Sequence, residues 1–265
     1  MKRDVDEIAV VYLLWGPLGA APLETFMSSY ARHPAGAAHR LVVLLKGVDS
    51  GELRDHATRL AGSLGAQCLP IAPTGLDLES YRGAAERIDA GRLCFLNSAS
   101  EILGDGWLRH LNDALVRPGV GIAGATASNE SLLASVPAPL RPLRQRRHPA
   151  FPNPHLRTNG FILERALMRD LDWRPARRKQ QAWSLESGGR SLTRQIAARG
   201  RQALVVGRDG TCFEQERWAA SRTFRSGAQD NLLIADNRTR EYDAAGGARR
   251  AELARLAWGA AAPPV

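Results

Sequence analysis

The chain is poor in cysteine, with only Cys68, Cys94 and Cys212 among 265 residues. No cysteine or histidine pair has the spacing of zinc ligands, and the six histidines show neither HxxxH nor HExxH, which argues against a zinc hydrolase. Three cysteines far apart in sequence indicate free thiols in a reducing compartment. A chain of this length buries enough surface to fold without disulfides.

Long apolar runs are also missing. The opening MKRDVDEIAVVYLLW turns acidic soon after Lys2 and Arg3, unlike a signal peptide. Its apolar part is about as long as a strand and too short to span a bilayer. We therefore expect a cytoplasmic protein, one that can touch the inner membrane face peripherally. Internal repeats and heptads are absent as well, which excludes solenoids and coiled coils.

Lysine is scarce, since only Lys2, Lys46 and Lys179 contribute to the 36 basic residues and the formal net charge of +9. The remaining basic residues are arginines, which favour bidentate contact with phosphate or carboxylate. The charge therefore indicates an anionic ligand, whether nucleotide, phospholipid or nucleic acid. The alternative is that an arginine- and alanine-rich composition reflects coding bias.

The first half of the chain alternates between short apolar runs and helical periodicity. The pattern predicts strands at Ile8–Leu14, Leu41–Leu45, Gln67–Ile71, Leu93–Leu96 and Val120–Ala125. Helices are expected between them: at Pro22–Tyr30, after a cap at Asp49, from Leu78 to a stop at Gly91, and from Trp107 to Leu115. This order predicts an α/β fold with a mainly parallel central sheet flanked by helices. Its ligand is expected at the carboxyl ends of the strands.

The second half is less regular. Ser135–Thr158 holds six prolines and the arginines 141, 144, 146 and 147, and predicts a long loop without helix or strand. A strand at Gly160–Leu163, a helix from Leu192 to a stop at Gly200, a strand at Ala203–Val206 and a helix at Ala248–Trp258 are expected beyond it. We expect one domain over residues 1–265, with this loop at 135–158 and a C-terminal extension at 211–265.

Three motifs are candidates for a binding or catalytic site, and each also has a purely structural interpretation. Gly119–Gly124 matches G-x-G-x-x-G, but its glycines lie inside a predicted strand, so close packing explains them better than a dinucleotide site. Asn97, Ser98 and Ser100 follow a buried strand, where they bind a ribose or phosphate, or else form a turn and helix cap. Glu186 precedes two glycines and a helix, where it serves as a general base or complements the helix dipole.

Together these stretches resemble the nucleotide-sugar glycosyltransferases of the GT-A fold, family 2 type. The likeness rests on the opening strand and helix, on Arg92–Ser100 with Gly106-Trp107-Leu108 and Pro118–Ala125, and on Glu186 through Val206. It implies a GT-A fold and transfer of a sugar, with inversion, from a nucleotide-sugar donor to a saccharide or lipid-linked acceptor. The setting it implies is bacterial cell-surface polysaccharide or glycoconjugate synthesis.

The resemblance also implies roles for residues. Glu186 corresponds to the catalytic base, and Asn97, Ser98, Ser100 and Asp77 to donor contacts. The family's Asp-any-Asp motif, which holds Mg²⁺ or Mn²⁺, reads Asn97-Ser98-Ala99-Ser100 here, without a carboxylate. If no metal is bound, cations must balance the leaving diphosphate. The candidate cations are Arg157, Arg190, Arg194 and Arg222, each of which is alternatively an ordinary solvated or helix-face arginine.

Two other functions compete with this one. The missing metal motif and the single acid at 186–187 favour a GT-A-like protein that binds a nucleotide sugar without catalysis. The net charge and the arginines at 141–147 favour nucleic acid, but few aromatics interleave with that cluster and no nucleic-acid module is recognised. We therefore expect no nucleic-acid partner. We expect the arginine-rich loop to lie beside the ligand cleft, facing an anionic acceptor or an anionic membrane.

Overall fold

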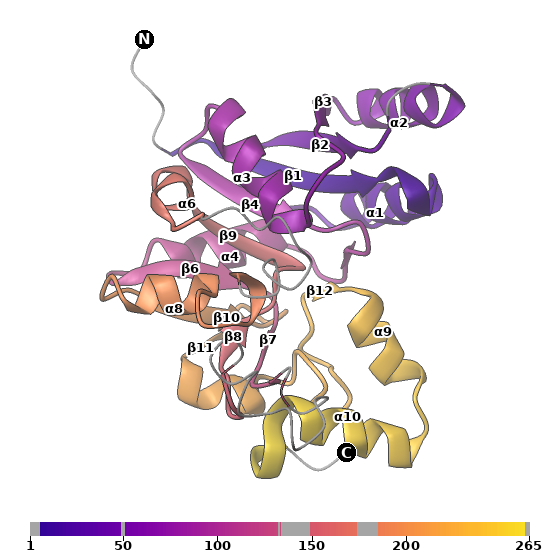
Figure 1. Ribbon diagram of the computed structural model, residues 1–265. Coiled ribbons are helices and arrows are strands. Elements are labelled where there is room, and N and C mark those ends of the chain that lie inside the picture. Colours follow the sequence, from indigo (N-terminus) through magenta and orange to yellow (C-terminus); the bar gives the residue numbers. More distant parts are fainter. Residues whose placement is uncertain (1–5, 49–50, 132, 134–148, 174–184, 263–265) are drawn as a thin grey trace.

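The computed structural model describes residues 6–48, 51–131, 133, 149–173 and 185–262. Its centre is an eight-stranded sheet with the order β11-β10-β6-β9-β4-β1-β2-β3 (Figure 1). The strands are β1 (Ile8–Trp15), β2 (Arg40–Lys46), β3 (Gln67–Ile71), β4 (Arg92–Leu96), β6 (Val120–Gly124), β9 (Gly160–Glu164), β10 (Gln202–Val206) and β11 (Cys212–Phe213). The pairs β1–β2, β1–β4, β2–β3 and β6–β10 are parallel, whereas β9 runs antiparallel between β4 and β6. The expected mainly parallel sheet is confirmed.

Helices lie on both faces of this sheet (Figure 1). The α-helices are α1 (Ala21–Arg32), α2 (Glu52–Ser63), α3 (Asp77–Arg87), α4 (Trp107–Leu115), α6 (Arg165–Asp170), α8 (Leu192–Ala197), α9 (Asn237–Ala244) and α10 (Gly247–Trp258), and the 3₁₀ turns are η1 (Gly16–Leu18), η4 (Gln215–Ser221) and η5 (Gly259–Ala261). None of the helices in the described ranges combines the length and apolarity needed to cross a bilayer.

Two expected helix ends need correction or fall outside the structure. Helix α3 ends at Arg87 rather than at Gly91, because the N–H groups of Gly91 and Arg92 bond to the carbonyl of Glu7 and so already belong to the sheet. The expected cap at Asp49 lies outside the described residues. Helix α6 was not predicted, since six residues offer too little periodicity.

Short strand pairs tie the second half of the chain to the sheet. Strand β7 (Ala127–Ser128) pairs with β8 (His155–Leu156), and β5 (Glu101–Ile102) pairs with β12 (Ile234–Ala235), both antiparallel. The expectation that 135–158 contains no element is therefore wrong at residues 155–156, where backbone pairing overrides the proline-rich composition. The arginines at 141–147 lie outside the described residues.

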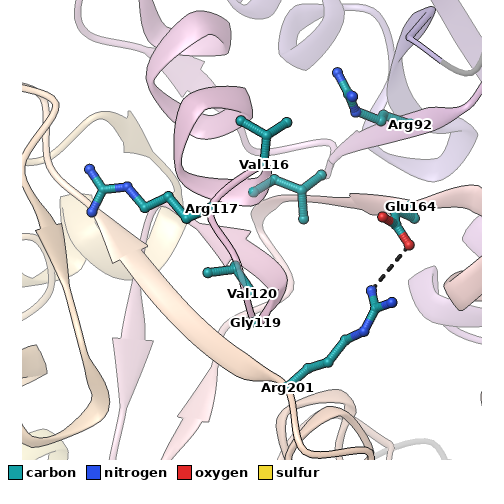
Figure 2. Close-up of a pocket in the computed structure, with 8 residues that line it drawn as sticks. Arg92, Val116, Arg117, Gly119, Val120, Glu164 and Arg201 are labelled. Carbon is teal, nitrogen blue, oxygen red and sulfur yellow. Dashed lines mark hydrogen bonds and ion pairs between the residues drawn. The ribbon is translucent and has the colours of Figure 1, made fainter.

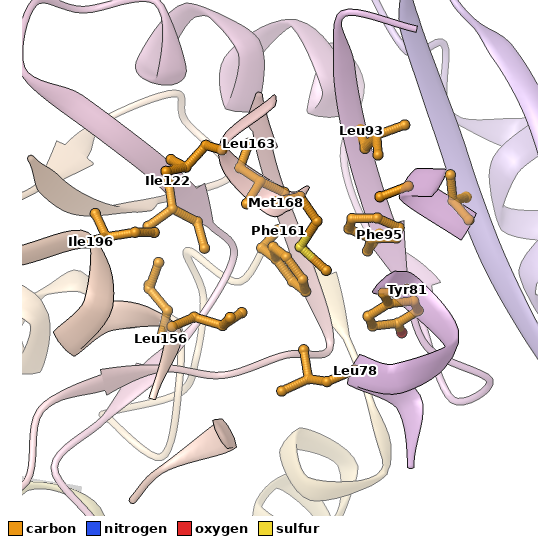
Figure 3. Packing of buried hydrophobic residues seen from close by; sticks show 14 of the residues in the cluster. Leu78, Tyr81, Leu93, Phe95, Ile122, Leu156, Phe161, Leu163, Met168 and Ile196 are labelled. Atoms are coloured by element: carbon orange, nitrogen blue, oxygen red, sulfur yellow. The ribbon is translucent and has the colours of Figure 1, made fainter. Parts of the chain in front are cut away.

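The sheet is apolar on both faces, which explains why its strands appear in the sequence as continuous apolar runs. On one face Tyr81 of α3 stacks on Phe95 with ring centroids 4.5 Å apart, and Phe161 completes the cluster (Figure 3). On the other face Tyr12 stacks on Phe26 of α1 at 4.1 Å. These layers fix the strand ends to which the functional groups are attached.

The glycines of the G-x-G-x-x-G string serve packing. A Cβ on Gly121 would lie 2.8 Å from Ile196 of α8, and the glycine lets that helix approach β6 closely. The packing interpretation of the motif is therefore the better one, and no helix begins directly after β6 where a dinucleotide site would need one.

Candidate functional site

Polar groups gather where the parallel strands end. Strands β1, β2, β4 and β6 end at this edge, and the antiparallel β9 begins there. The N–H of Asn97, after β4, donates to the carbonyl of Asn159, before β9, at 3.2 Å. The turn after β4 therefore lies directly beside the start of β9, at the edge where an α/β sheet binds its ligand.

The turn Asn97–Ser100 is held by its own side chains. Asn97 Oδ1 accepts hydrogen bonds from the Ala99 N–H and the Ser100 hydroxyl, both at 3.0 Å. The Ser100 hydroxyl has one hydrogen, which it shares between Asn97 Oδ1 and the nearer Asn159 carbonyl, at 2.8 Å. The Ser98 hydroxyl donates to the Leu13 carbonyl at 2.6 Å and accepts from the Trp15 N–H at 3.1 Å. Asn97, Ser98 and Ser100 thus form a turn, which was the structural interpretation of this motif in the sequence analysis.

This turn does not fit a divalent cation. Mg²⁺ and Mn²⁺ prefer carboxylate oxygens, and the turn has none. Its one side-chain carbonyl, Asn97 Oδ1, already accepts two hydrogen bonds, and both serine hydroxyls are engaged within the protein. Across the described residues no group of three or more His, Cys, Asp or Glu side chains is arranged to hold a metal ion.

Glu186 is a carboxylate at this edge whose charge is not balanced by a hydrogen bond or ion pair from the described residues. Its backbone is anchored by the buried Leu185 on one side and by Ser187 on the other, whose carbonyl accepts from Asn153 Nδ2 at 2.6 Å. No hydrogen bond or ion pair to its carboxylate is found in the part of the chain that the structure describes. Burial and the nearby Asp77 carboxylate raise the pKa of Glu186 to about 7, against the Arg157 guanidinium. Such a group exchanges protons near neutral pH.

Asp77 begins α3 and joins Glu186 in one electrostatic cluster. Burial raises the pKa of Asp77, and the Lys46 ammonium opposes that shift. Lys46, at the end of β2, is buried and donates to the Gly75 carbonyl at 2.6 Å. Burial lowers the pKa of Lys46 against the attraction of Asp77 and Glu79. The cluster therefore combines two carboxylates, whose ionised forms are disfavoured by burial, with one buried ammonium.

Tyr81 lies beneath this cluster. Its hydroxyl is buried and has no hydrogen-bond partner among the described residues. Burial raises the pKa of the hydroxyl, and the Asp77 and Glu186 carboxylates raise it further. A phenol group kept close to two carboxylates stays protonated, so its O–H remains available as a hydrogen-bond donor.

A second network reaches the same edge from the C-terminal extension. Arg157 Nη2 lies 2.6 Å from Asp236 Oδ2, and only 14% and 1% of the two side chains are exposed. The guanidinium also covers the Phe224 ring, with its carbon 4.1 Å from the ring centroid. Asp236 Oδ1 caps α9 by accepting from the Arg238 and Thr239 N–H groups. Burial would raise the pKa of Asp236, but Arg157 and the cap outweigh it, so the pKa is lowered.

The network continues to the turn after β4. Arg157 Nη1 donates to the Thr126 hydroxyl at 3.3 Å, and that hydroxyl donates to Asn159 Oδ1 at 2.6 Å. Asn159 in turn accepts from Asn97 and Ser100 through its carbonyl. Asn159 Nδ2 is buried and unpaired within the described residues. Glu186, the β4 turn and the C-terminal extension thus share one polar site.

The other predicted cations lie in different contacts. Arg190 is 3.8 Å from Asp172, and Arg194 Nη2 donates to Asn153 Oδ1 at 3.2 Å. Arg194 therefore reaches the residue that anchors the Glu186 segment. Arg222 pairs with Asp230 at 2.6 Å in a separate cavity of about 410 Å³ beyond the end of β10. Among the candidate arginines, Arg157 lies close enough to Glu186 to lower the pKa of its carboxyl group.

Sequence reasoning missed the contacts of Tyr81, Asn159 and Asp236 at this edge of the sheet. It also missed Arg240 of α9, whose Nη2 donates to the Ala99 carbonyl at 3.0 Å. The role of Asp236 as a helix cap could have been predicted, because aspartate is a preferred N-cap residue and Thr239 lies three positions later. The roles of Arg240 and Asn159 could not, since their positions depend on contacts between distant segments.

A second cavity, of about 330 Å³, lies at the opposite edge of the sheet (Figure 2). Its lining comes from the start of β4, β6 and β10 and the end of α4. Arg201 pairs with Glu164 there at 3.1 Å, while Arg92 and Arg117 point away from that pair (Figure 2). The arginines do not converge on a common point, so the cavity is no second anion site.

No protein-family model and no curated protein matches the chain. Among solved structures it is similar to glucosyl-3-phosphoglycerate synthase from Mycobacterium tuberculosis, in complex with Mn²⁺, uridine diphosphate and glucosyl-3-phosphoglycerate, at 16% identity and a TM-score of 0.42. That match covers 62% of this chain and 59% of the synthase. The chain thus spans about three fifths of that enzyme's length.

Two further similar structures contain a nucleotide or a nucleotide sugar. A mannosyltransferase from Pyrobaculum calidifontis, in complex with GDP-mannose and Mn²⁺, is 14% identical with a TM-score of 0.46, over 82% of this chain and 59% of that one. A CMP:2-keto-3-deoxy-manno-octonic acid synthetase complexed with CTP is 11% identical with a TM-score of 0.43, over 68% and 83%.

Proposed function

We propose that the protein is an inverting glycosyltransferase that moves a sugar from a nucleotide-sugar donor to a saccharide or lipid-linked acceptor. The observation that carries the proposal is Glu186. It is a carboxylate with no partner in the described structure, and its pKa is raised to about 7 at the ligand edge of a mainly parallel sheet. A base that removes a proton from a sugar hydroxyl needs this environment.

The chemistry follows from the position of Glu186. Its carboxylate accepts the proton of the acceptor hydroxyl while the hydroxyl oxygen attacks the anomeric carbon of the donor. The bond from that carbon to the diphosphate oxygen breaks, and the nucleoside diphosphate leaves with the bonding electrons. Attack from the face opposite the leaving group inverts the anomeric centre.

Donor binding is assigned to the turn after β4 and to Asp77. The Nδ2 group of Asn97 makes no hydrogen bond in the described part of the chain and is available to a donor oxygen. Ser98 and Ser100 hold the turn in shape, and the role proposed for Asp77 is to accept hydrogen bonds from donor hydroxyls. Arg157 places a positive charge beside Glu186. Arg190 and Arg194 support the segment that contains Glu186. The arginine-rich loop remains predicted to recruit an anionic acceptor or membrane.

The proposal is tested by adding nucleoside diphosphates to the purified protein. At least one of UDP, GDP, ADP, CDP or TDP at millimolar concentration is expected to raise the melting temperature, because a ligand that binds only the folded state stabilises it by mass action. The same nucleotide attached to a sugar is then the donor to assay. No shift with any of the five would refute donor binding.

A pH profile tests the role of Glu186. The base must be deprotonated, so the log of the transfer rate is expected to rise with unit slope up to about pH 7 and then level off, following the raised pKa of Glu186. The Asp77 carboxylate raises the pKa of Glu186 and so shifts the rising part of the profile to higher pH, whereas Arg157 lowers this pKa and shifts it to lower pH. A rate that stays flat down to pH 5 would contradict a base with this pKa.

A further inference from the structure

The turn after β4 receives an arginine from the far end of the chain. Arg240 lies in α9, and its Nη2 donates to the Ala99 carbonyl at 3.0 Å across 141 positions of sequence. Its Nη1 lies 3.3 Å from Glu101 Oε2. The side chain is 45% exposed. The guanidinium therefore lies on the turn and is still open to a ligand.

Three contacts fix this placement. Strand β12 pairs with β5, which puts Ile234 opposite Ile102 and Ala235 opposite Glu101. Asp236 then caps α9 and pairs with Arg157. Helix α9 begins at Asn237, directly after Asp236. Arg240 lies in the first turn of this helix, so it is positioned before any ligand arrives. A preorganised cation loses little freedom on binding.

The turn offers a second donor beside it. Asn97 Nδ2 is unpaired in the described residues, while Asn97 Oδ1 already accepts from Ala99 and Ser100. Arg240 has five N–H donors in all, and its contacts with Ala99 and Glu101 use only part of them. A guanidinium and an amide on one turn suit phosphate oxygens, whereas the turn does not fit a metal ion.

We propose that Arg240 binds the diphosphate of the nucleotide donor and takes the place of the divalent cation at this turn. The inference rests on the proposed function, because it assumes a nucleotide ligand. The guanidinium neutralises the negative charge that grows on the diphosphate as it leaves, and it does so as a fixed part of the protein. Binding of the nucleotide then requires no added metal.

The experiment is calorimetric titration of the purified protein with UDP, GDP, ADP, CDP and TDP, once in EDTA and once in MgCl₂ or MnCl₂. The wild type is expected to bind the preferred nucleotide within about threefold of the same affinity in both buffers. Arg240→Gln is expected to weaken it about 10- to 100-fold, the range for losing a hydrogen bond to a charged group. Arg240→Lys keeps the charge and is expected to lose less.

Arg238→Gln is the matched control. Arg238 lies on the same helix, is 59% exposed and pairs with Glu241 rather than with the turn. It removes the same charge without touching Ala99, so it is expected to bind the nucleotide nearly as tightly as the wild type. The nucleoside monophosphate is a second control, because it lacks the second phosphate and should depend less on Arg240.

The outcomes separate this inference from the proposed function. Binding that appears only with Mg²⁺ or Mn²⁺ overturns the inference and leaves the glycosyltransferase proposal standing. Equal weakening in Arg238→Gln and Arg240→Gln overturns it too, since general positive potential then explains the effect. Unchanged binding in Arg240→Gln does the same. Failure of all five nucleotides to bind in either buffer removes both proposals together.

Discussion

Glu186→Gln is expected to reduce sugar transfer by about 100- to 10,000-fold, the usual contribution of a general base. Glutamine keeps the shape and hydrogen-bonding reach of the side chain but cannot take the acceptor proton. The measurement is the release of nucleoside diphosphate from the donor in the presence of acceptor. Donor affinity should change little, because in the proposed mechanism the carboxylate contacts the acceptor hydroxyl rather than the diphosphate.

The stability of this variant separates lost chemistry from lost folding. Burial raises the pKa of Glu186 above its unfolded value, so the folded protein binds this proton more tightly. The group is therefore least unfavourable below about pH 4, and it destabilises the fold increasingly as pH rises towards 7. Glu186→Gln should unfold at the same or a higher temperature than the wild type at pH 8. Glu164→Gln, at the opposite sheet edge, is the control for assay and expression.

An intact transfer rate in Glu186→Gln would exclude Glu186 as the base. Donor binding combined with no transfer in the wild type, whatever acceptor is offered, would favour the alternative of a nucleotide-sugar-binding protein without catalysis. The single acid at 186–187 is what keeps that alternative open.

Asp236→Ala is expected to lower the free energy of unfolding by about 3–5 kcal/mol, because it leaves the Arg157 charge buried without its partner. Loss of the α9 cap adds to this, at about 1 kcal/mol. Urea unfolding at pH 7 measures the change. Combining Asp236→Ala with Arg157→Met should recover much of the loss, since a pair removed together leaves no lone charge.

The effect of Asp236→Ala depends on pH in a defined direction. Arg157 and the cap lower the pKa of Asp236 below its unfolded value, so its stabilisation is fully present above about pH 4 and disappears as pH falls through the lowered pKa. The difference between wild type and variant should therefore shrink in acid. A difference that is constant from pH 7 to pH 3 would mean that the Asp236 charge contributes nothing.

Most strands of the first half could be predicted because they are buried on both faces, whereas the edge strand β3 has only exposed and half-buried side chains. Ile8–Leu14 and Leu41–Leu45 stand out as continuous β-branched or leucine runs, and the structure extends each by only one or two residues. The pairs β5–β12 and β7–β8 could not be predicted, since two-residue strands have no periodicity to detect. The antiparallel direction of β9 was equally hidden, because a buried strand has the same apolar pattern in either direction.

For the candidate site the sequence supplied Glu186, Asp77 and Arg157, and it identified the β4 turn. The candidate cation Arg222 lies apart from that site, in a cavity with Asp230. The sequence analysis treated Asn97, Ser98 and Ser100 as ligand groups or turn formers without deciding between them. Their bonds to Leu13, Ala99 and Asn159 show that they build the turn. The contact between Arg240 and Ala99 depends on α9 packing against a turn 141 positions away, which no local pattern encodes.

Asp236 uses one carboxylate for two purposes, since Oδ2 holds Arg157 and Oδ1 begins α9. Docking of the C-terminal extension and completion of the polar site are therefore a single event. During synthesis on the ribosome the site stays incomplete until residue 240 has left the exit tunnel, and Ala257 and Trp258, which belong to the same apolar core as Phe95 and Phe161, emerge later still. A nascent chain of this protein therefore completes its core only after its site.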